Sequence, residues 1–543
     1  MAAPDQRDTI RFLGRPTAYP RHRGAVRRID THGAVVFLAG ARAYKLKRAV
    51  RFPYMDLSTP AKRLAACRAE VVVNRRTAPD LYLGLSAVLE RKGGLRLGPL
   101  REPDAISADE RTRARDWVVV MRRFPDDALY SRIAAQGKLD VREAEAIAEA
   151  VARFHAASPP VRAAARARSM RWVLDSNEAS LAAWSPALFA AADLRTLTRQ
   201  SDASLARVSR LLAERRRQGY VRHLHGDLHL RNICRLDGRP VLFDALEFDS
   251  RLATMDVLYD LAFLLMDMEH RGLREAANRL FNHYLALSVD PARPTALKGL
   301  AALPLFLSAR AAIRAHTEAA AVETQLSAAA SRARRADAEA YLLLAHRLLT
   351  PPGPALVAIG GLSGSGKTTL ARALAPGLGA APGALVLRSD VIRKRLAGVD
   401  PLARLPPSAY GPESSRAVYR AIGRGARTAL AAGQSVVADA VFAREDERRV
   451  IARVAARLNV PFVGLWLDAP GTTMAARLDA RRGDASDATK RVLAQQLGYD
   501  LGTMTWTRID AAAGAAAVAA RAKGTLDARL AMNNTGKRRK RLI

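Results

Sequence analysis

The sequence predicts two domains of different fold class, an α+β domain followed by an α/β domain with a parallel, doubly wound sheet. In the first part strand-like segments precede a long helical region, whereas in the second part short apolar strands alternate with helices. The proline-rich segment TPPGP, at 350–354, separates the two patterns. We therefore place the domains at 1–350 and 355–532, with a linker at 351–354 and a basic, disordered tail at 533–543.

The length and charge of the chain fit this division. A chain of 543 residues is too long for one ordinary domain. Lys and Arg total 87 against 52 for Asp and Glu, so the formal net charge is +35. Such a charge attracts anionic partners such as nucleic acid, nucleotides or a membrane surface. The arginines are dispersed, however, and only the tail GKRRKRLI concentrates them, which favours solvated helix faces in an arginine-rich protein.

The cysteine content and the hydropathy pattern predict a globular, cytoplasmic protein. Cys67 and Cys234 are the two cysteines, and they lack the paired spacing of a zinc site. No apolar run approaches the roughly 18–20 residues that a membrane span needs. The first residues also lack the apolar core of a signal peptide. We therefore expect neither a disulfide nor a membrane partner.

The first domain is expected to begin with strands and to continue with helices. Residues 30–50 alternate around Gly40 as a β-hairpin does. A helix is predicted over 59–76, a strand over 116–124 and an amphipathic helix over 141–157. The helical region then reaches about residue 217. Beyond it, two short apolar runs flank the turn LDGR, and packed helices are predicted from 294 to 350.

The second domain alternates buried strands with helical segments. The predicted strands are ALVAIGG, ALVLRSD, SVVADAVF and PFVGLWLD, and the helix TTLARALA follows the first of them. Such alternation is typical of a parallel sheet with crossover helices.

A complete phosphate-binding loop follows the first strand of this domain. The segment GLSGSGKT fits the pattern G-x-x-x-x-G-K-[ST], in which backbone N–H groups and a helix N-terminus surround phosphate oxygens. Lys367 is expected to neutralise the β- and γ-phosphates, and the Thr368 hydroxyl to ligate Mg²⁺. The predicted ATP-binding residues here are Gly361, Leu362, Ser363, Gly364, Ser365, Gly366, Lys367, Thr368 and Thr369.

The acidic residues after the next strands indicate a kinase rather than a motor. Asp439 is expected to help hold Mg²⁺, and Ala440 stands where hydrolytic motors usually carry a glutamate. Asp390 and Arg393 lie just past the second strand, where we expect an acceptor to bind. We assign Asp390 to acceptor binding and Arg393 to catalysis. A helix N-cap is the competing interpretation of Asp390.

An arginine-rich segment follows the fourth strand. Arg477, Arg481 and Arg482 lie on a predicted helix, and Asp484 and Asp487 lie on the acidic loop after it. We assign Arg477 and Arg481 to stabilising charge on the transferring phosphoryl group. A solvated helix face is the alternative for each of these arginines. The region 355–510 resembles the P-loop kinases that include gluconate kinase-like, zeta toxin-like and polynucleotide kinase-like enzymes.

A second site is predicted in the first domain. The segment HGDLHLRN fits the catalytic-loop spacing H-x-D-x-x-x-x-N of protein kinase-like enzymes. Asp227 is expected to receive or orient the acceptor hydroxyl, and Asn232 to ligate Mg²⁺. LFDALEFD then supplies Asp244 at the end of a strand, where the second metal-binding carboxylate belongs. A hydrogen-bonded loop without catalysis is the alternative, and we expect His225 to brace the backbone rather than act as a base.

The strand lysine and helix glutamate of such a site also occur in order. Lys45 and Lys47 alternate onto one face of a strand, and A-x-K points to Lys45 as the nucleotide-binding residue. Glu70, on the helix at 59–76, is its expected partner. A mere surface ion pair is the alternative. Asp256 and Asp260, in TMDVLYDLAF, are expected to anchor the loop and cap a helix.

These motifs resemble those of aminoglycoside phosphotransferase-like kinases, which have the protein kinase-like fold with a β-rich small lobe and a helical large lobe. More closely, ARAYKLKRAVRFPYMDLSTPAKR, NRRTAPDLYLG and HLHGDLHLRNI resemble bacterial proteins in which such a domain is fused to a P-loop kinase. The resemblance covers about 20–530. One departure is that no G-x-G-x-x-G loop precedes Lys45, and Gly33 and Gly40 are the nearest glycines.

The sequence therefore predicts an ATP- and Mg²⁺-dependent phosphotransferase that acts on a hydroxyl of a small molecule. Two alternatives stay open. In the first alternative, the chain is a polynucleotide 5′-hydroxyl kinase or a nucleic-acid-associated ATP-binding protein. The basic tail favours this alternative, but the aromatic content of 6% does not. In the other, a degenerate first domain regulates the second. A sugar or an anionic metabolite suits the basic chain at least as well as an aminoglycoside does.

Overall fold

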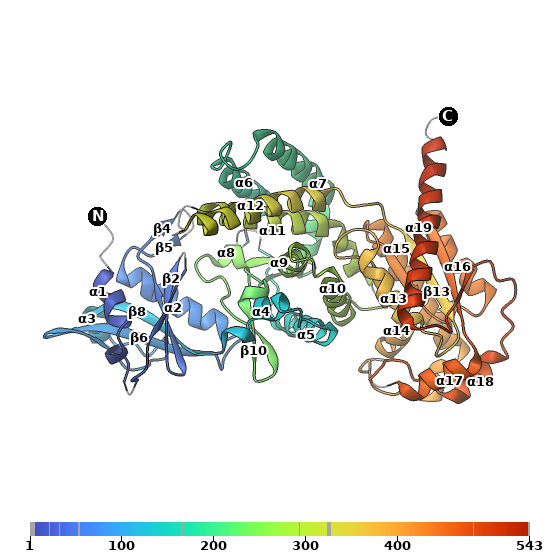
Figure 1. Ribbon diagram of the computed structural model, residues 1–543, viewed down its shortest axis with the longest axis horizontal. Coiled ribbons are helices and arrows are strands. Elements are labelled where there is room, and N and C mark those ends of the chain that lie inside the picture. The colour runs from blue at the N-terminus through green and yellow to red at the C-terminus, as the bar shows by residue number, and fades with distance from the viewer. Residues whose placement is uncertain are drawn as a thin grey trace. The chain divides into compact units, whose positions relative to one another are not determined.

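The computed structural model describes residues 6–540 except 21, 32, 53–54, 164, 166, 293, 323–326 and 482, and only the backbone of residues 52 and 532–540. The chain forms two compact units (Figure 1). The first comprises 1–198, 213–267 and 309–342, and the second comprises 199–212, 268–308 and 343–543. This division is less simple than the linear boundary predicted at 351–354, because residues 199–212 and 268–308 belong to the second unit.

The first unit carries a six-stranded antiparallel sheet in the order β1-β2-β3-β8-β6-β7. Its strands are β1 (Arg27–Asp30), β2 (Ala34–Ala39), β3 (Arg42–Lys47), β6 (Tyr82–Arg91), β7 (Gly94–Leu97) and β8 (Ala114–Arg122). The predicted hairpin is confirmed, and Gly40 makes its turn with φ of +60°. The helix α2 (Pro60–Asn74) begins after Thr59, whose hydroxyl caps it by accepting from the Lys62 N–H. Leu64 and Val71 of this helix join the sheet residues Leu85 and Val119 in one apolar core.

Helices and short strand pairs make up the rest of this unit. The predicted helix at 141–157 is confirmed as α5 (Val141–Ala157). The hairpin of β10 (Ile233–Leu236) and β11 (Arg239–Leu242) is also confirmed, and β9 (Val221–His223) pairs with β12 (Thr254–Asp256). The other main helices before residue 350 are α6 (Met170–Ala182), α7 (Ala191–Arg217), α9 (Val257–His270), α11 (Leu303–Val322) and α12 (Ala328–Leu349). All of them except α6 also contribute residues to the second unit. Shorter elements are α1 (Arg7–Leu13), β4 (Arg51–Phe52), β5 (Met55–Asp56), α3 (Ala108–Arg113), α4 (Tyr130–Ala135), η4 (Leu230–Asn232) and α8 (Ser250–Ala253).

One stretch of the described residues, Pro294–Val322, is long and apolar enough to cross a membrane, so the expectation that no apolar run approaches that length is wrong. Of its most apolar window, 72% is buried inside the protein. Burial of this kind is what the core helix of a soluble protein shows, because apolar residues gather in the interior.

The second unit carries a five-stranded parallel sheet in the order β14-β15-β13-β16-β17. Its strands are β13 (Leu356–Gly361), β14 (Leu385–Arg388), β15 (Val436–Asp439), β16 (Phe462–Asp468) and β17 (Thr507–Asp510). The helices of this part are α13 (Lys367–Leu374), α14 (Ser389–Leu396), α15 (Pro412–Ala431), α16 (Glu445–Arg457), α17 (Gly471–Ala480), α18 (Lys490–Leu497) and α19 (Ala515–Lys540). The predicted doubly wound sheet is confirmed, and a site is expected at the carboxyl end of the central strand β13.

The edge of this sheet is covered by the helix α10 (Arg274–Ser288). The side-chain amide of Asn282 accepts from the Val386 N–H at 2.7 Å and donates to the Ala384 carbonyl oxygen at 3.1 Å. Asn278 donates to the same carbonyl oxygen at 3.0 Å. Because β14 is an edge strand, these amides satisfy backbone groups that a further strand would otherwise pair. These contacts attach α10 to the second unit, which also includes η5 (Pro294–Ala302).

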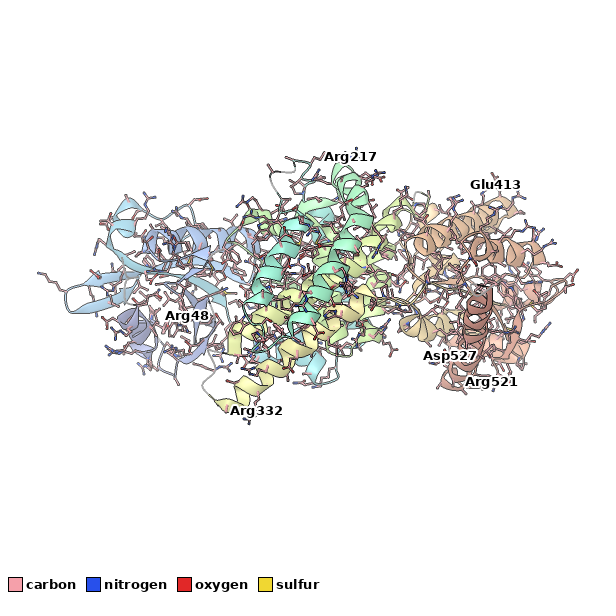
Figure 2. The ribbon with its side chains drawn as sticks, turned by 90° about the horizontal axis from the view of Figure 1, so that it is seen from above. Arg48, Arg217, Arg332, Glu413, Arg521 and Asp527 are labelled. Carbon is pink, nitrogen blue, oxygen red and sulfur yellow. The ribbon has the colours of Figure 1, made fainter. Side chains whose placement is uncertain are left out.

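The helix α19 extends to Lys540 and therefore includes most of the segment that we expected to be disordered. Lys and Arg are good helix formers, so a basic sequence alone does not exclude a helix. Residues 541–543 lie outside the described part. Figure 2 shows charged side chains, such as those of Arg217 on α7 and Arg332 on α12, projecting outward from different elements, in keeping with a dispersed positive charge.

Candidate active sites of the two units

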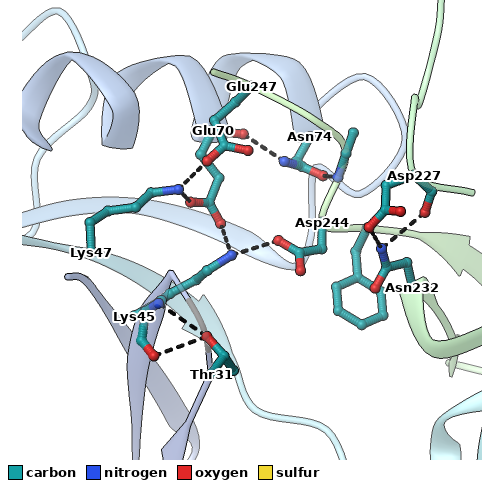
Figure 3. Close-up of polar contacts among 12 residues, drawn as sticks. Thr31, Lys45, Lys47, Glu70, Asn74, Asp227, Asn232, Asp244 and Glu247 are labelled. Atoms are coloured by element: carbon teal, nitrogen blue, oxygen red, sulfur yellow. Dashed lines mark hydrogen bonds and ion pairs between the residues drawn. The ribbon is translucent and has the colours of Figure 1, made fainter. Parts of the chain in front are cut away.

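Two lysines of the first unit meet one buried glutamate (Figure 3). Lys45 Nζ lies 2.8 Å from Glu70 Oε1, and Lys47 Nζ lies 2.5 Å from Glu70 Oε2. The lysines are two residues apart on β3 and so project from the same face. The Glu70 side chain is 0% exposed, which rules out a mere surface pair. Burial by itself raises the pKa of Glu70, but the ammonium groups of Lys45 and Lys47 lower it to about 2.

Two further carboxylates complete this cluster from the loop after β11. Asp244 Oδ1 lies 2.5 Å from Lys45 Nζ, and Glu247 pairs with Lys47. Asp244 has a left-handed backbone with φ of +59°, which is costly for a residue other than glycine and is held here by the Tyr82 hydroxyl, which accepts from its N–H at 3.1 Å. Sequence reasoning found Asp244 but missed Glu247, although LFDALEFD places it three residues later.

Asp227 and Asn232 are brought together as predicted. The Asn232 side-chain N–H group donates to Asp227 Oδ2 at 2.9 Å and to its carbonyl oxygen at 3.0 Å. His229 Nε2 lies 3.4 Å from Asp227 Oδ2. Burial raises the pKa of Asp227, but His229 and Arg314 outweigh it and hold this pKa below the usual range. The ionised carboxylate can therefore accept a hydrogen bond from a hydroxyl at neutral pH.

The loop that carries Asp227 is fixed by buried polar contacts. Asp260 Oδ1 accepts from the Gly226 N–H at 2.9 Å, which confirms its expected anchoring role. His225 Nε2 contacts the Phe243 carbonyl oxygen at 2.9 Å, so this histidine braces the backbone as predicted. Asp256 accepts from the Leu258 N–H at 2.9 Å in the first turn of α9, which confirms its expected capping role, and it also accepts from Arg215 at 2.7 and 2.8 Å. These contacts hold Asp227 without engaging its carboxylate.

The phosphate-binding loop of the second unit lies between β13 and α13. Gly364 has φ of +82°, and a Cβ atom there would lie 2.4 Å from the Met474 carbonyl oxygen. Only glycine fits such a position, because both the backbone conformation and the contact exclude a side chain. Lys367 Nζ donates to the Leu362 carbonyl oxygen at 2.9 Å, which folds the lysine back over the loop. The Ser363 N–H donates to Gln496 Oε1 at 2.8 Å, a contact that sequence reasoning missed.

The residues expected to hold Mg²⁺ supply the oxygen atoms that this ion prefers. The Thr368 hydroxyl donates to Asp439 Oδ2 at 2.6 Å, so the two predicted ligands of the second unit lie side by side. Among the described residues no group of three or more His, Cys, Asp or Glu side chains forms a metal cage of its own. Mg²⁺ at kinase sites needs only one or two protein carboxylates, because phosphates and water complete its shell. Thr368 and Asp439 fit this pattern, as do Asn232 and Asp244.

Arg388, at the end of β14, connects three acids of the second unit, and the sequence analysis did not single it out. Its guanidinium lies 2.5 Å from Asp484, 3.8 Å from Asp439 and 4.0 Å from Asp390. Its side chain is 10% exposed. The sequence did offer a sign of this role, because Arg388 directly precedes Ser389 and Asp390 in the segment LRSD. Because one guanidinium serves acids from three segments, it fixes their positions relative to one another.

Asp390 is the second residue of α14, and Arg388 occupies the N-cap position, so the competing N-cap interpretation of Asp390 is wrong. Burial raises the pKa of the Asp390 carboxyl, and Asp439 nearby adds to this effect, against the opposing charge of Arg388. A carboxylate with a raised pKa is a better proton acceptor than an ordinary aspartate. Asp390 is thus suited to contact an acceptor hydroxyl.

The predicted catalytic arginines all line one pocket of about 1640 Å³ together with Lys367 and Asp390. Arg393 donates to the Ala409 carbonyl oxygen at 2.8 Å and lies over the Tyr410 ring at 4.9 Å. Arg477 donates to the Ala513 carbonyl oxygen at 3.2 Å, and Arg481 follows the end of α17. Arg482 lies outside the described residues. The loop after α17 is tied down by Asp487, which accepts from Lys394, Tyr410 and the Leu405 N–H.

The fold and the two sites define this chain as a pair of kinase domains joined in one polypeptide. The family model of the phosphotransferase enzyme family matches residues 99–297, and that of an AAA domain matches 356–499. The uncharacterized protein Rv2004c of Mycobacterium tuberculosis is 31% identical over 492 residues, which cover 89% of this chain and 92% of that protein. The chain therefore belongs to the same family as that mycobacterial protein.

Two further similarities cover smaller parts of this chain. The adenylyl-sulfate kinase of Myxococcus xanthus is 31% identical over 142 residues, which cover 26% of this chain and 69% of that enzyme. The crystal structure of a choline/ethanolamine kinase family protein from Mesorhizobium loti is 14% identical, with a TM-score of 0.35, over 62% of this chain and 98% of that one.

Proposed function

We propose that this protein transfers the γ-phosphoryl group of ATP to a hydroxyl of a small molecule, and that each unit has its own Mg-ATP site. The observation that carries the proposal is the convergence of Lys367, Arg388 and Asp390 on one pocket, with Thr368 and Asp439 side by side next to it. Phosphate-binding, metal-binding and acceptor-binding groups are thus within reach of one another. A cytoplasmic location, where ATP and Mg²⁺ are abundant, suits this activity.

In the second unit, backbone N–H groups of the loop and the Lys367 ammonium bind the phosphates of ATP. Thr368 and Asp439 would hold Mg²⁺, which would neutralise negative charge on the phosphates. Asp390 accepts the proton of the acceptor hydroxyl while the acceptor oxygen bonds to the γ-phosphorus and the bond to the β,γ-bridging oxygen breaks, releasing ADP. Arg477 and Arg481 stabilise the charge that spreads over the transferring group.

In the first unit the same reaction uses side chains in place of a backbone loop. Lys45, held by Glu70, binds the phosphates, and Asn232 with Asp244 binds the metal ion. Asp227 orients the acceptor hydroxyl and takes its proton as the new P–O bond forms. The Lys45 ammonium contacts both Glu70 and Asp244, so phosphate-binding and metal-binding groups are already adjacent before ATP enters.

Single-site variants of the full chain test the two assignments separately. Lys367→Ala and Asp227→Asn are each screened with γ-labelled ATP against a library of metabolites, with Arg332→Gln on an exposed face as the matched control. Each site variant is expected to lose the products of one unit only, and the double variant to lose all. If Asp227→Asn leaves every product and ATP affinity intact, the first site is not a kinase site. The same outcome for Lys367→Ala would remove the second assignment.

The alternatives predict different results in the same assays. If the first unit only regulates the second, Lys45→Met will change the rate of the second unit and abolish no product. If nucleic acid is the acceptor, oligonucleotides will be labelled, and their affinity will fall steeply with added salt.

A further inference from the structure

An arginine cluster lies beside the loop that carries Asp227 in the first unit. Arg310 on α11 donates from Nη1 to the Gly226 carbonyl oxygen at 3.1 Å, so this helix contacts the residue just before Asp227. Arg314 follows one turn later on the same helix and pairs with Glu318. The Arg314 guanidinium also lies 5.6 Å from the centre of the Tyr341 ring. Arg314 therefore lies one helical turn from the arginine that contacts the residue before Asp227.

Two more guanidinium groups reach the same glutamate. Arg334 on α12 pairs with Glu318, and Arg231 Nη1 lies 3.8 Å from Glu318 Oε1. Arg231 is on the same loop as Asp227, four residues later. The Glu318 side chain is 3% exposed, whereas those of Arg231 and Arg334 are 45% and 34% exposed. The carboxylate is therefore buried beneath arginines that solvent, and a ligand, can reach.

The charges of this cluster favour an anion. Three guanidinium groups stand against the two carboxylates of Asp227 and Glu318, which leaves an excess of positive charge. Burial lowers the pKa of Arg314, but Glu318, then Tyr341 and, more weakly, Asp227 outweigh it and raise the pKa of this already basic group. A positively charged acceptor placed against Asp227 would meet Arg314, whereas a phosphate or carboxylate group would be attracted to it. Guanidinium groups also match the planar and tetrahedral oxyanions of these groups by bidentate hydrogen bonding.

We propose that Arg231, Arg314 and Arg334 form the anion-binding part of the acceptor site of the first unit, so that the acceptor carries a phosphate or carboxylate group besides its hydroxyl. Arg314 acts as the central contact, and Glu318 is the carboxylate with which the three arginines pair and against which an anionic ligand would compete. The proposal rests on the proposed function of Asp227 as the residue that receives the acceptor hydroxyl. The same clamp would set the distance between the anionic group of the acceptor and the hydroxyl that reacts.

The test measures binding by titration calorimetry on the full chain carrying Lys367→Ala, saturated with Mg²⁺ and a non-hydrolysable ATP analogue. Inorganic phosphate, glycerate and ethanolamine serve as the phosphate, carboxylate and cationic probes. We expect phosphate or glycerate to bind and ethanolamine not to bind. The anion that binds tighter identifies which group the acceptor carries.

Charge variants then locate the binding. Arg314→Gln is expected to weaken anion binding by about tenfold or more, because a desolvated charge contact is lost. Glu318→Gln is expected to tighten binding several-fold, because it removes the opposing charge, and this opposite sign separates anion binding from a merely structural role. Arg332→Gln, on the exposed face of α12, is the control and should change nothing. Melting temperatures confirm that each variant is folded.

Three results would overturn the inference: no anion binding, equal binding in Arg314→Gln and the control, or weaker binding in Glu318→Gln. Failure of the underlying function gives a different result. In that case Lys45→Met, added to Lys367→Ala, removes no nucleotide binding at all. Nucleotide binding that depends on Lys45, together with anion binding that ignores Arg314, leaves the first site a kinase site and removes only its anionic acceptor.

Discussion

The guanidinium of Arg388 contacts the carboxylate of Asp484 at 2.5 Å, which ties the end of β14 to the loop after α17. Since Arg388 also faces Asp390 and Asp439, we expect Arg388→Gln to misplace acceptor-binding and metal-binding groups together. Loss of such a partly buried, charge-assisted contact is worth about 1.5–3 kcal/mol, or roughly 10–100-fold in kcat/KM of the second unit.

The measurement for Arg388 uses an Asp227→Asn background, so that only the second unit acts. Arg388→Lys is expected to recover part of the loss, because it restores the charge without the planar geometry. Arg508→Gln is the matched control, since Arg508 pairs with Asp468 at 2.7 Å on the exposed surface. Equal activity of Arg388→Gln and Arg508→Gln would show that Arg388 positions nothing.

Glu70→Gln should change how stability depends on pH. The pKa of Glu70 is lower in the folded protein, at about 2, than its ordinary value of 4.5. Its contribution to the free energy of unfolding is therefore complete above about pH 4.5 and is lost as the pH falls towards 2. The wild-type chain should exceed the variant in stability at pH 6, and the difference should shrink at pH 3. Urea unfolding at the two pH values measures it, with the exposed Glu90→Gln as control.

Asp439→Asn should raise the Mg²⁺ concentration that the second unit needs. The hydrogen bond from the Thr368 hydroxyl is preserved by the amide oxygen, but one negative charge on the metal site is lost. We expect the Mg²⁺ concentration for half-maximal activity to rise by about 10–100-fold, while the activity at saturating Mg²⁺ falls less. An unchanged Mg²⁺ titration would remove Asp439 from the metal site.

Asn282→Leu should destabilise the second unit. The variant keeps most of the side-chain volume but leaves the Val386 N–H without its partner at 2.7 Å. An unsatisfied buried group of this kind costs about 1–3 kcal/mol. Guanidinium unfolding measures the loss, and Glu275→Ala, an exposed change on the same helix, is the control. If both variants unfold alike, the amide contacts contribute little.

Local patterns accounted for the strands and the motifs. Alternation around Gly40 and the spacing of GLSGSGKT each depend on a few neighbouring residues, and the structure confirms both. The pairing of Lys45 with Glu70 was also predictable, because kinase-like domains carry a strand lysine followed by a helix glutamate, and this sequence has both in that order. The partners that were missed, Glu247 and Arg388, form their contacts across distant segments. A single sequence does not show which of its many arginines and acids will meet after folding.

The grouping of α10 with the second unit bears on where the chain can be divided into two separate proteins. The family match to phosphotransferases runs to residue 297, yet residues 268–308 are counted with the P-loop sheet. A gene split at codon 351 would leave the second product without the helix whose amides satisfy its edge strand. The two regions therefore cannot be separated at residue 351 without removing a helix that contacts the sheet of the second unit.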